Sequence, residues 1–139
     1  MQPYQNFFHQ FISMYRPLIN KANNQLTKYQ LYTSQWAILN LLYLKGPYTN
    51  VEIANHQNVE KPTITRMIQR LEELNYVELV PGKDRREKKI QLTDYGMEIC
   101  AEIKLMIKEL EIDALRGITE TEQEEVSRVL ATVRENLLK

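Results

Sequence analysis

The segment Asp84–Gly96, which reads DRREKKIQLTDYG, constrains the fold more than any other part of the chain. Its apolar residues Ile90 and Leu92 alternate with polar ones, and this period of two predicts a half-buried strand. Thr93 then offers a hydroxyl for the N-cap of a helix. A Pro-Gly turn signal lies upstream, so residues 76–92 are expected to form a β-hairpin with a basic tip. The segment therefore predicts a basic hairpin that runs directly into a helix.

The charge of the chain is balanced in total but uneven along its length. Its 139 residues, which suit one domain, include 18 Lys and Arg and 18 Asp and Glu. Residues 61–92 hold eight basic and five acidic residues, whereas residues 93–139 hold six and eleven. A basic region around the hairpin favours contact with nucleic-acid phosphates, and an acidic remainder would orient the approach to DNA.

Several kinds of site and compartment are disfavoured by the residue types present. The chain has one cysteine, Cys100, which excludes an internal disulfide framework. The only histidines are His9 and His56, and no cluster has the spacing of metal ligands, so we expect no metal and no cofactor. No nucleophile with an adjacent base is visible, so we predict that the protein is not an enzyme. The lack of a signal peptide or long apolar run predicts a cytoplasmic protein with no membrane partner.

Apolar residues recur at steps of three and four, which predicts amphipathic helices before the hairpin. These helices are expected at about residues 4–26, 33–45, 49–56 and 62–74. Pro17 lies inside the first and predicts a bend or break there. Thr33 is expected to cap the second helix, and Thr49 with Glu52 forms a capping box for the third.

The third and fourth helices are short and follow each other across a tight polar turn, as in a helix-turn-helix. The buried side of the fourth helix is predicted to hold Ile64, Met67, Ile68, Leu71 and Leu74, which leaves Thr, Arg and Gln residues pointing outward. The hairpin follows directly. We therefore predict a mainly α fold of the α+β class, with a winged helix-turn-helix over about residues 33–92.

Two further helices are expected after the hairpin, separated by Gly117, with a capping box of Thr119 and Glu122 opening the last one. The apolar faces of the terminal helices need a partner. Packing them against a second copy would give a two-fold homodimer. Its two recognition helices could address the half-sites of a palindromic operator, roughly 10 bp apart.

Four segments resemble the MarR family of bacterial transcriptional regulators: TSQWAILNLL, TNVEIA, KPTITRMIQRLEEL and DRREKKIQLTDYG. The last is the most specific, with its Asp-x-Arg, Leu-Thr and following Gly in the family's order. The resemblance implies one MarR-like domain over residues 1–139, with dimerisation helices at about 1–30 and 94–139. It also implies a sequence-specific DNA-binding regulator, with repression as the family's default.

The resemblance implies three sets of DNA contacts. Facing the major groove would be residues of the fourth helix: Lys61, Pro62, Thr63, Thr65, Arg66 and Gln69. The wing, with Asp84, Arg85 and Arg86, would approach the minor groove, where Asp84 would hold the Arg86 guanidinium in a bidentate pair. Expected phosphate contacts are Thr49, Arg70, Lys83 and Lys88.

Two differences from the family pattern concern the recognition helix and the wing. Asn75 stands where members often have the Gly that ends the recognition helix, and Asn also tolerates the left-handed conformation. Leu79 stands where members often have Arg, and the turn at residues 81–83 is about one residue shorter than usual. The second difference bears on how far the wing reaches.

Aromatic residues gather in the first two expected helices, next to where the family binds small, often aromatic or phenolic, effectors. The candidate effector residues are Phe11, Tyr15, Tyr32, Trp36 and Tyr43. An effector there would favour a dimer shape with mismatched recognition-helix spacing and so release the DNA. The alternative is that these residues belong to the core or to the dimer interface.

Two other functions stay open at this point. A winged helix can also serve as a protein-interaction module without specific DNA binding. A redox-responsive regulator could use Cys100, although that residue lies among apolar neighbours and oxidant sensors of the family generally use a cysteine near the N-terminus.

Overall fold

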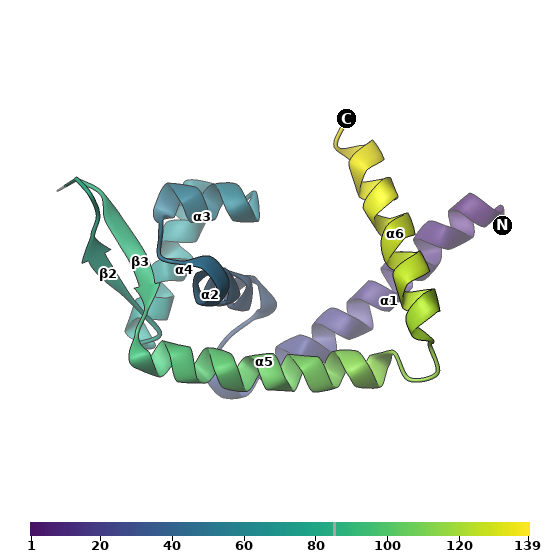
Figure 1. Ribbon diagram of the computed structural model, residues 1–139, viewed down its shortest axis with the longest axis horizontal. Coiled ribbons are helices and arrows are strands. Elements are labelled where there is room, and N and C mark those ends of the chain that lie inside the picture. The colour runs from purple at the N-terminus through teal and green to yellow at the C-terminus, as the bar shows by residue number, and fades with distance from the viewer. Residues whose placement is uncertain (85) are drawn as a thin grey trace. The chain divides into compact units, whose positions relative to one another are not determined.

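The chain folds into helices around one small sheet, as seen in a computed structural model that describes residues 1–84 and 86–139. The helices are α1 (Pro3–Leu26), η1 (Thr27–Tyr29, a 3-10 turn), α2 (Thr33–Lys45), α3 (Asn50–Gln57), α4 (Lys61–Glu73), α5 (Asp94–Ala114) and α6 (Glu120–Leu137) (Figure 1). The strands are β1 (Tyr48–Thr49), β2 (Val77–Pro81) and β3 (Lys88–Leu92). This architecture confirms the predicted mainly α, winged helix-turn-helix fold.

The chain divides into two compact units, residues 1–107 and residues 108–139. The first unit holds α1 to α4, the sheet and most of α5, whereas the second holds the end of α5 and the whole of α6. Among the described residues, none of the helices combines the length and the apolar composition needed to cross a membrane.

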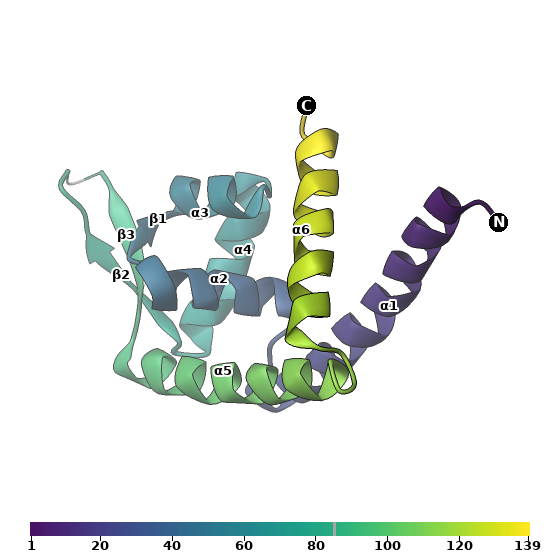
Figure 2. The same cartoon turned by 45° about the vertical axis from the view of Figure 1, so that its right-hand side comes forward.

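The sheet is antiparallel, with strand order β1-β3-β2 (Figure 2). The β2–β3 hairpin pairs Val77 with Leu92 and Pro81 with Lys88, which confirms the predicted hairpin. The strand β1 was not expected. It adds Tyr48 opposite Ile90 on the other edge of β3, and two residues are too few to produce a visible alternation.

Helix α1 runs unbroken through Pro17, so of the predicted bend or break the break is wrong, and the bend stays a prediction. Proline removes a single backbone hydrogen bond, and the helix continues on both sides of it. Only Ala22 and Leu26 of this helix are buried. The C-terminal end of α1 is therefore the part that packs on the rest of its unit.

The two predicted capping boxes are present. The N–H of Glu52 donates to Thr49 Oγ1 at 3.2 Å, and the N–H of Thr49 donates to Glu52 Oε1 at 3.0 Å. Thr119 and Glu122 make the same pair of bonds at 3.1 and 2.9 Å. At the start of α5, the N–H of Gly96 donates to Thr93 Oγ1 at 2.9 Å, so that predicted cap is also confirmed.

The predicted cap at Thr33 is wrong by one residue, because Tyr32 occupies the N-cap position of α2. Gln35 Oε1 accepts a hydrogen bond from the N–H of Tyr32 at 2.9 Å. The N–H of Thr33 donates to Asn23 Oδ1 at 2.8 Å. A side chain from α1 therefore satisfies a donor that the sequence alone would assign to a local cap.

The core lies within the winged helix and beneath the start of α5. Its fully buried side chains are Leu26, Leu31, Ile38, Leu39, Ile53, Ile64, Leu71, Cys100 and Ile103. Leu31 lies between η1 and α2, and the others come from α1, α2, α3, α4 and α5. One apolar cluster therefore holds α4, the predicted recognition helix, against its neighbours.

Candidate nucleic-acid interface

Helices α3 and α4 meet across a turn in which Asn58 takes a left-handed conformation, with φ 53°. The N–H of Val59 donates to the Ala54 carbonyl at 3.1 Å and closes the end of α3. Asn50 Nδ2 at the start of α3 donates to Thr65 Oγ1 in α4 at 2.8 Å. These bonds close the turn and join the two helices, as in a helix-turn-helix.

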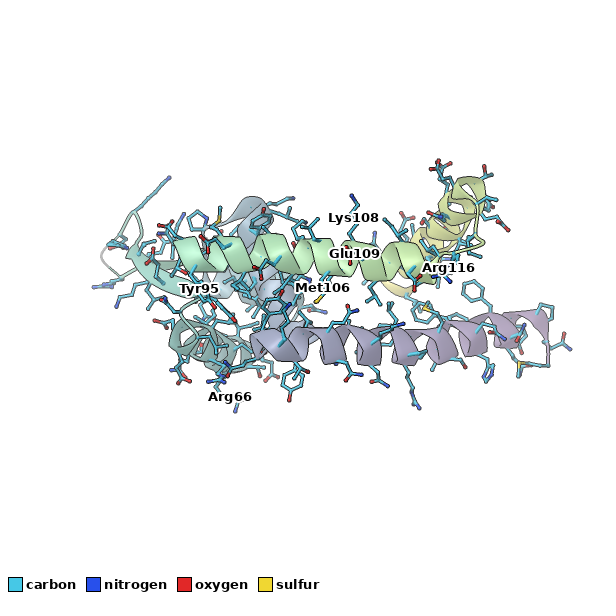
Figure 3. The ribbon with its side chains drawn as sticks, turned by 90° about the horizontal axis from the view of Figure 1, so that it is seen from below. Arg66, Tyr95, Met106, Lys108, Glu109 and Arg116 are labelled. Atoms are coloured by element: carbon cyan, nitrogen blue, oxygen red, sulfur yellow. The ribbon has the colours of Figure 1, made fainter. Side chains whose placement is uncertain are left out.

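The two faces of α4 differ in burial. Ile64, Ile68 and Leu71 are buried, as predicted, whereas Met67 and Leu74 of the same predicted face are half-buried against the core. Arg66 and Gln69 are exposed on the opposite side, and Figure 3 shows Arg66 at the outer edge of the helix. The packing of the apolar side therefore presents a polar surface that a DNA groove can receive.

The remaining predicted groove residues lie at the start of α4. Lys61 and Pro62 are exposed, whereas Thr63 and Thr65 are half-buried. The Thr65 hydroxyl accepts from Asn50 and donates to the Lys61 carbonyl at 3.0 Å. This hydroxyl is thus engaged within the protein, which leaves the methyl group of Thr65 as its apolar contact group.

Arg70, a predicted phosphate contact, is bonded to two other side chains. Its Nη1 lies 3.3 Å from Glu73 Oε2, and its Nη2 donates to Gln30 Oε1 at 3.2 Å. Gln30 belongs to the turn that follows η1. Arg70 therefore connects α4 to the end of the α1 segment, a contact between residues 40 positions apart.

The wing tip is a tight loop between β2 and β3. The N–H of Gly82 donates to the Glu87 carbonyl at 2.7 Å, and the N–H of Glu87 donates to the Asp84 carbonyl at 2.9 Å. Exposed on this loop and the adjoining strand are Lys83, Asp84, Arg86 and Lys88, while Arg85 lies outside the described residues. The tip thus projects several cations from a closed turn.

The predicted bidentate pair between Asp84 and Arg86 is wrong for this structure. Asp84 Oδ1 instead accepts from the backbone N–H of Arg86 at 3.4 Å. The short side chain of an aspartate readily bonds to the backbone N–H two residues later in a turn. That N–H is closer to the carboxylate along the chain than the guanidinium at the end of the arginine side chain. The Asp84 side chain therefore shapes the wing tip and leaves the Arg86 guanidinium to other partners.

Thr49 lies where β1, α3 and β3 meet, and Lys89 is its register partner in β3. The pKa of Glu52 is lowered chiefly by the hydrogen bond from the Thr49 backbone, then by the Thr49 hydroxyl, with smaller contributions from Lys89 and His56. The sequence analysis omitted Lys89 from the site. Only the pairing of β1 with β3 reveals that this lysine stands beside Thr49.

The salt bridges in the described part of the chain do not involve the wing or the start of α4. They join Arg70 to Glu73, Arg116 to Asp113 and Arg128 to Glu125. None of them uses Lys61, Arg66, Lys83, Arg86 or Lys88. Apart from Arg70, the described cations of the predicted DNA face are therefore not paired with carboxylates within the described structure.

The five candidate effector residues divide into two groups. Phe11 and Tyr15 stack on α1 with ring centroids 6.2 Å apart and are 40% and 50% exposed. Trp36 and Tyr43 pack against the core, which favours the alternative of a packing role for them, and Tyr32 is 64% exposed. Among the described residues, no aromatic pair joins α1 to α2.

Cys100 is fully buried on α5, with its Sγ 3.9 Å from the Leu39 carbonyl oxygen. Burial raises the pKa of the Cys100 thiol to about 12, and nearby Lys104 lowers it only in part. Reactive thiols are exposed and have a lowered pKa. The environment of Cys100 therefore favours a packing role over redox sensing.

Comparison with protein families matches residues 31–88 to the model described as the MarR family. The chain is 37% identical over 124 residues to the uncharacterized HTH-type transcriptional regulator YwoH of Bacillus subtilis, covering 89% of this chain and 90% of YwoH. It is 31% identical to an uncharacterized HTH-type transcriptional regulator of Staphylococcus aureus strain Mu50, covering 97% and 94% of the two chains.

Solved structures give the same result. Staphylococcus aureus MarR in complex with salicylate and kanamycin superposes with a TM-score of 0.89 at 29% identity, covering 97% of this chain and 92% of that one. The S. aureus MepR–DNA complex shares the fold, with a TM-score of 0.84 at 21% identity over 94% and 97% of the two chains. The chain therefore belongs to the MarR family of winged-helix transcriptional regulators.

Proposed function

We propose that the protein is a repressor that binds a palindromic operator as a homodimer and is released by a small aromatic or phenolic ligand. The observation that carries this proposal is the exposed polar face of α4 beside a wing whose cations have no carboxylate partner in the described structure. The groove contacts, the dimer and the ligand are supported by different parts of the molecule.

The proposed DNA contacts follow from the faces of α4 and the wing. Arg66 and Gln69 are exposed and would read base edges in the major groove, where Arg pairs with guanine and Gln with adenine. Lys61, Thr63 and Thr65 would lie near the entry of the helix into the groove. Arg86 would approach the minor groove, with Asp84 shaping the tip. Arg85, which lies outside the described residues, is retained as a proposed minor-groove contact from the sequence.

Phosphate contacts would fix the register of the protein on the duplex. We assign them to Thr49, Lys83 and Lys88, and add Lys89 because its strand partner is Thr49. Arg70 would contribute through the donors that Glu73 and Gln30 leave unused, since a guanidinium carries five N–H groups.

The dimer is proposed because the terminal helices expose apolar faces. On α1, Phe8, Ile12 and Tyr15 are 46%, 55% and 50% exposed. On α6, which has no buried residue, Val126 and Leu130 are 54% and 36% exposed. Amphipathic helices of this kind are stable in water when a second surface covers them. A second copy would supply identical faces, with residues 1–30 and 94–139 as dimerisation segments.

The ligand is proposed from the exposed aromatic residues and from the MarR relative that was solved with salicylate and kanamycin. Phe11, Tyr15 and Tyr32 are exposed to solvent, and salicylate is itself a phenolic acid. A ligand that prefers one dimer shape shifts the protein toward that shape by its differential affinity. Salicylate is therefore the first compound to test.

The experiment that tests DNA recognition is selection of bound duplexes from a random pool by the purified protein. We expect a palindrome with half-sites about one turn apart and an affinity that falls steeply as salt rises. Enrichment of no sequence, with weak binding that is equal for all duplexes, would overturn the repressor and favour a protein-interaction module. A single half-site would overturn the dimer alone.

Release by a ligand is tested on the selected operator. Fluorescence anisotropy of labelled operator is followed while salicylate is added, with cyclohexanecarboxylate as the non-aromatic control at equal ionic strength. We expect salicylate to lower the affinity and the control to leave it unchanged. Equal effects of the two acids would rule out recognition of the aromatic ring.

A further inference from the structure

A short turn after α1 is bonded to two other helices and is here called the Tyr29–Gln30 turn. Gln30 takes a left-handed conformation, with φ 61°, and its N–H donates to the Thr27 carbonyl at 2.9 Å. The N–H of Leu31 returns to the Leu26 carbonyl at 3.2 Å. These bonds close the end of α1, so the carbonyl of Tyr29 has a defined direction.

Tyr76 joins this turn to the end of the recognition helix. It follows Asn75, whose φ of 64° ends α4, and its N–H donates to the Leu71 carbonyl at 3.0 Å. Its hydroxyl donates to the Tyr29 carbonyl oxygen at 2.8 Å. Tyr76 and Tyr29 are 4% and 6% exposed, so this hydrogen bond is shielded from water.

Two further bonds reinforce the same connection. The Tyr29 hydroxyl donates to Glu102 Oε2 on α5 at 3.2 Å. Arg70 Nη2 on α4 donates to Gln30 Oε1 at 3.2 Å. The Tyr29–Gln30 turn is therefore hydrogen-bonded to the recognition helix and to Tyr76 just after its end, and also to α5.

We propose that Tyr29 and Tyr76 are positioning residues that hold the recognition helix at a set orientation to α1. The inference rests on the proposed function, because it assumes that α1 belongs to the dimer and that two copies of α4 read two half-sites. A displacement of α1 would then pass to α4 through a buried hydrogen bond rather than be absorbed in a loose turn. Neither tyrosine contacts DNA in this arrangement.

The measurement that distinguishes a positioning role from a purely stabilising role is the preference of the protein for one spacing between the two operator half-sites. The operator selected by the wild-type protein is compared with versions that have one base pair inserted or removed at the centre. Tyr76→Phe removes the hydroxyl that bonds to the Tyr29 carbonyl, whereas Tyr29→Phe removes the hydroxyl that bonds the turn to Glu102 on α5. We expect Tyr76→Phe to lose part of the spacing preference, by about three- to tenfold, as one hydrogen bond suggests, and Tyr29→Phe to lose no more than Tyr76→Phe.

The matched control is Leu110→Val, which removes a methylene group from a buried side chain of α5 that lies outside both the turn and the core cluster around α4. It lowers the melting temperature by cavity formation, yet it should retain the wild-type spacing preference. Sedimentation analysis of all variants checks that each remains an assembly of the wild-type size.

The outcomes distinguish this inference from the proposed function. If the wild-type protein selects no spaced palindrome, the proposed function itself fails. If the wild type has a sharp spacing preference and Tyr76→Phe keeps it, the positioning role is overturned. If Leu110→Val loses the preference as much as Tyr76→Phe does, the effect is one of general stability and the positioning role is likewise overturned.

Discussion

A Cβ atom on Gly96 would overlap the carbonyl oxygen of Tyr76. This same carbonyl accepts a hydrogen bond from the N–H of Thr93 at 3.1 Å. Thr93 Oγ1 in turn donates to the Asn75 carbonyl at 2.7 Å and accepts from the N–H of Gly96. The first turn of α5 and the end of the recognition helix therefore touch through their backbones, which requires a residue without a side chain at position 96.

We expect Gly96→Ala to destabilise the protein by about 1–3 kcal/mol, because the Tyr76 backbone must move to make room. The measurement is the free energy of unfolding in urea. Alanine is otherwise preferred over glycine in a helix by about 1 kcal/mol, so Ala101→Gly at an exposed position of α5 serves as the control. A Gly96→Ala protein that is more stable than wild type would contradict the close contact.

Loss of Arg66 or Arg86 should weaken operator binding in different ways. We expect Arg66→Ala to cost about 1–3 kcal/mol and to relax the base preference at one position of each half-site. We expect Arg86→Ala to cost a similar amount, about 1–3 kcal/mol, through lost minor-groove contacts. Anisotropy titrations with operator variants measure both. Arg128→Ala on α6, where Arg128 pairs with Glu125, is the control, and a loss of affinity as large for it would disprove the assignment.

The capping box of α3 predicts a pH dependence of stability. The pKa of Glu52 is lowered by the Thr49 bonds, so its contribution is present above the unfolded value of 4.5 and is lost as pH falls through the folded pKa. Glu52→Gln keeps an acceptor but removes the titration. The stability of wild type relative to this variant should therefore decrease from about pH 6 to about pH 3. Glu124→Gln, at an exposed position of α6, is the control. A constant difference between wild type and Glu52→Gln would refute the role.

Cys100 should be unreactive in the folded protein. Its pKa is raised to about 12 by burial, so the thiol stays protonated near neutral pH. Reaction with a disulfide reagent should be slow in buffer and fast in urea, and peroxide should leave operator binding unchanged. Because burial raises this pKa, the unfolded chain loses the thiol proton at a lower pH than the folded chain does. Stability should therefore decline as pH rises from 9.0 toward about 12. Rapid labelling of the native protein would restore the redox alternative.

A charge on either terminal apolar face should separate the proposed dimer. Ile12 and Val126 are 55% and 54% exposed on α1 and α6, so Ile12→Asp and Val126→Asp should leave each chain folded while they oppose burial against a second copy. Sedimentation equilibrium measures the shift toward monomer. Gln10→Asp places the same charge at an exposed position of α1 and is the control. Monomeric wild-type protein would refute the dimer directly.

The parts of the candidate site that depend on residues close together in the chain were largely predicted from the sequence. Thr49 with Glu52 and Thr119 with Glu122 close capping boxes because both partners lie within one turn. The alternation around Ile90 predicted the hairpin, since the side chains of a strand point to opposite faces. The exposed position of Arg66 followed from the period of the apolar residues on α4.

The tertiary structure alone decided the contacts between distant segments. The strand β1 exists because Tyr48 finds an open edge of β3 opposite Ile90, and Asn23 replaces a local cap at Thr33 across the end of α1. Tyr76 bonds to a backbone carbonyl 47 residues away. A carbonyl has no residue type, so bonds of this kind leave no pattern in the sequence. Sequence periodicity determined which faces are apolar, and packing determined which groups those faces bring together.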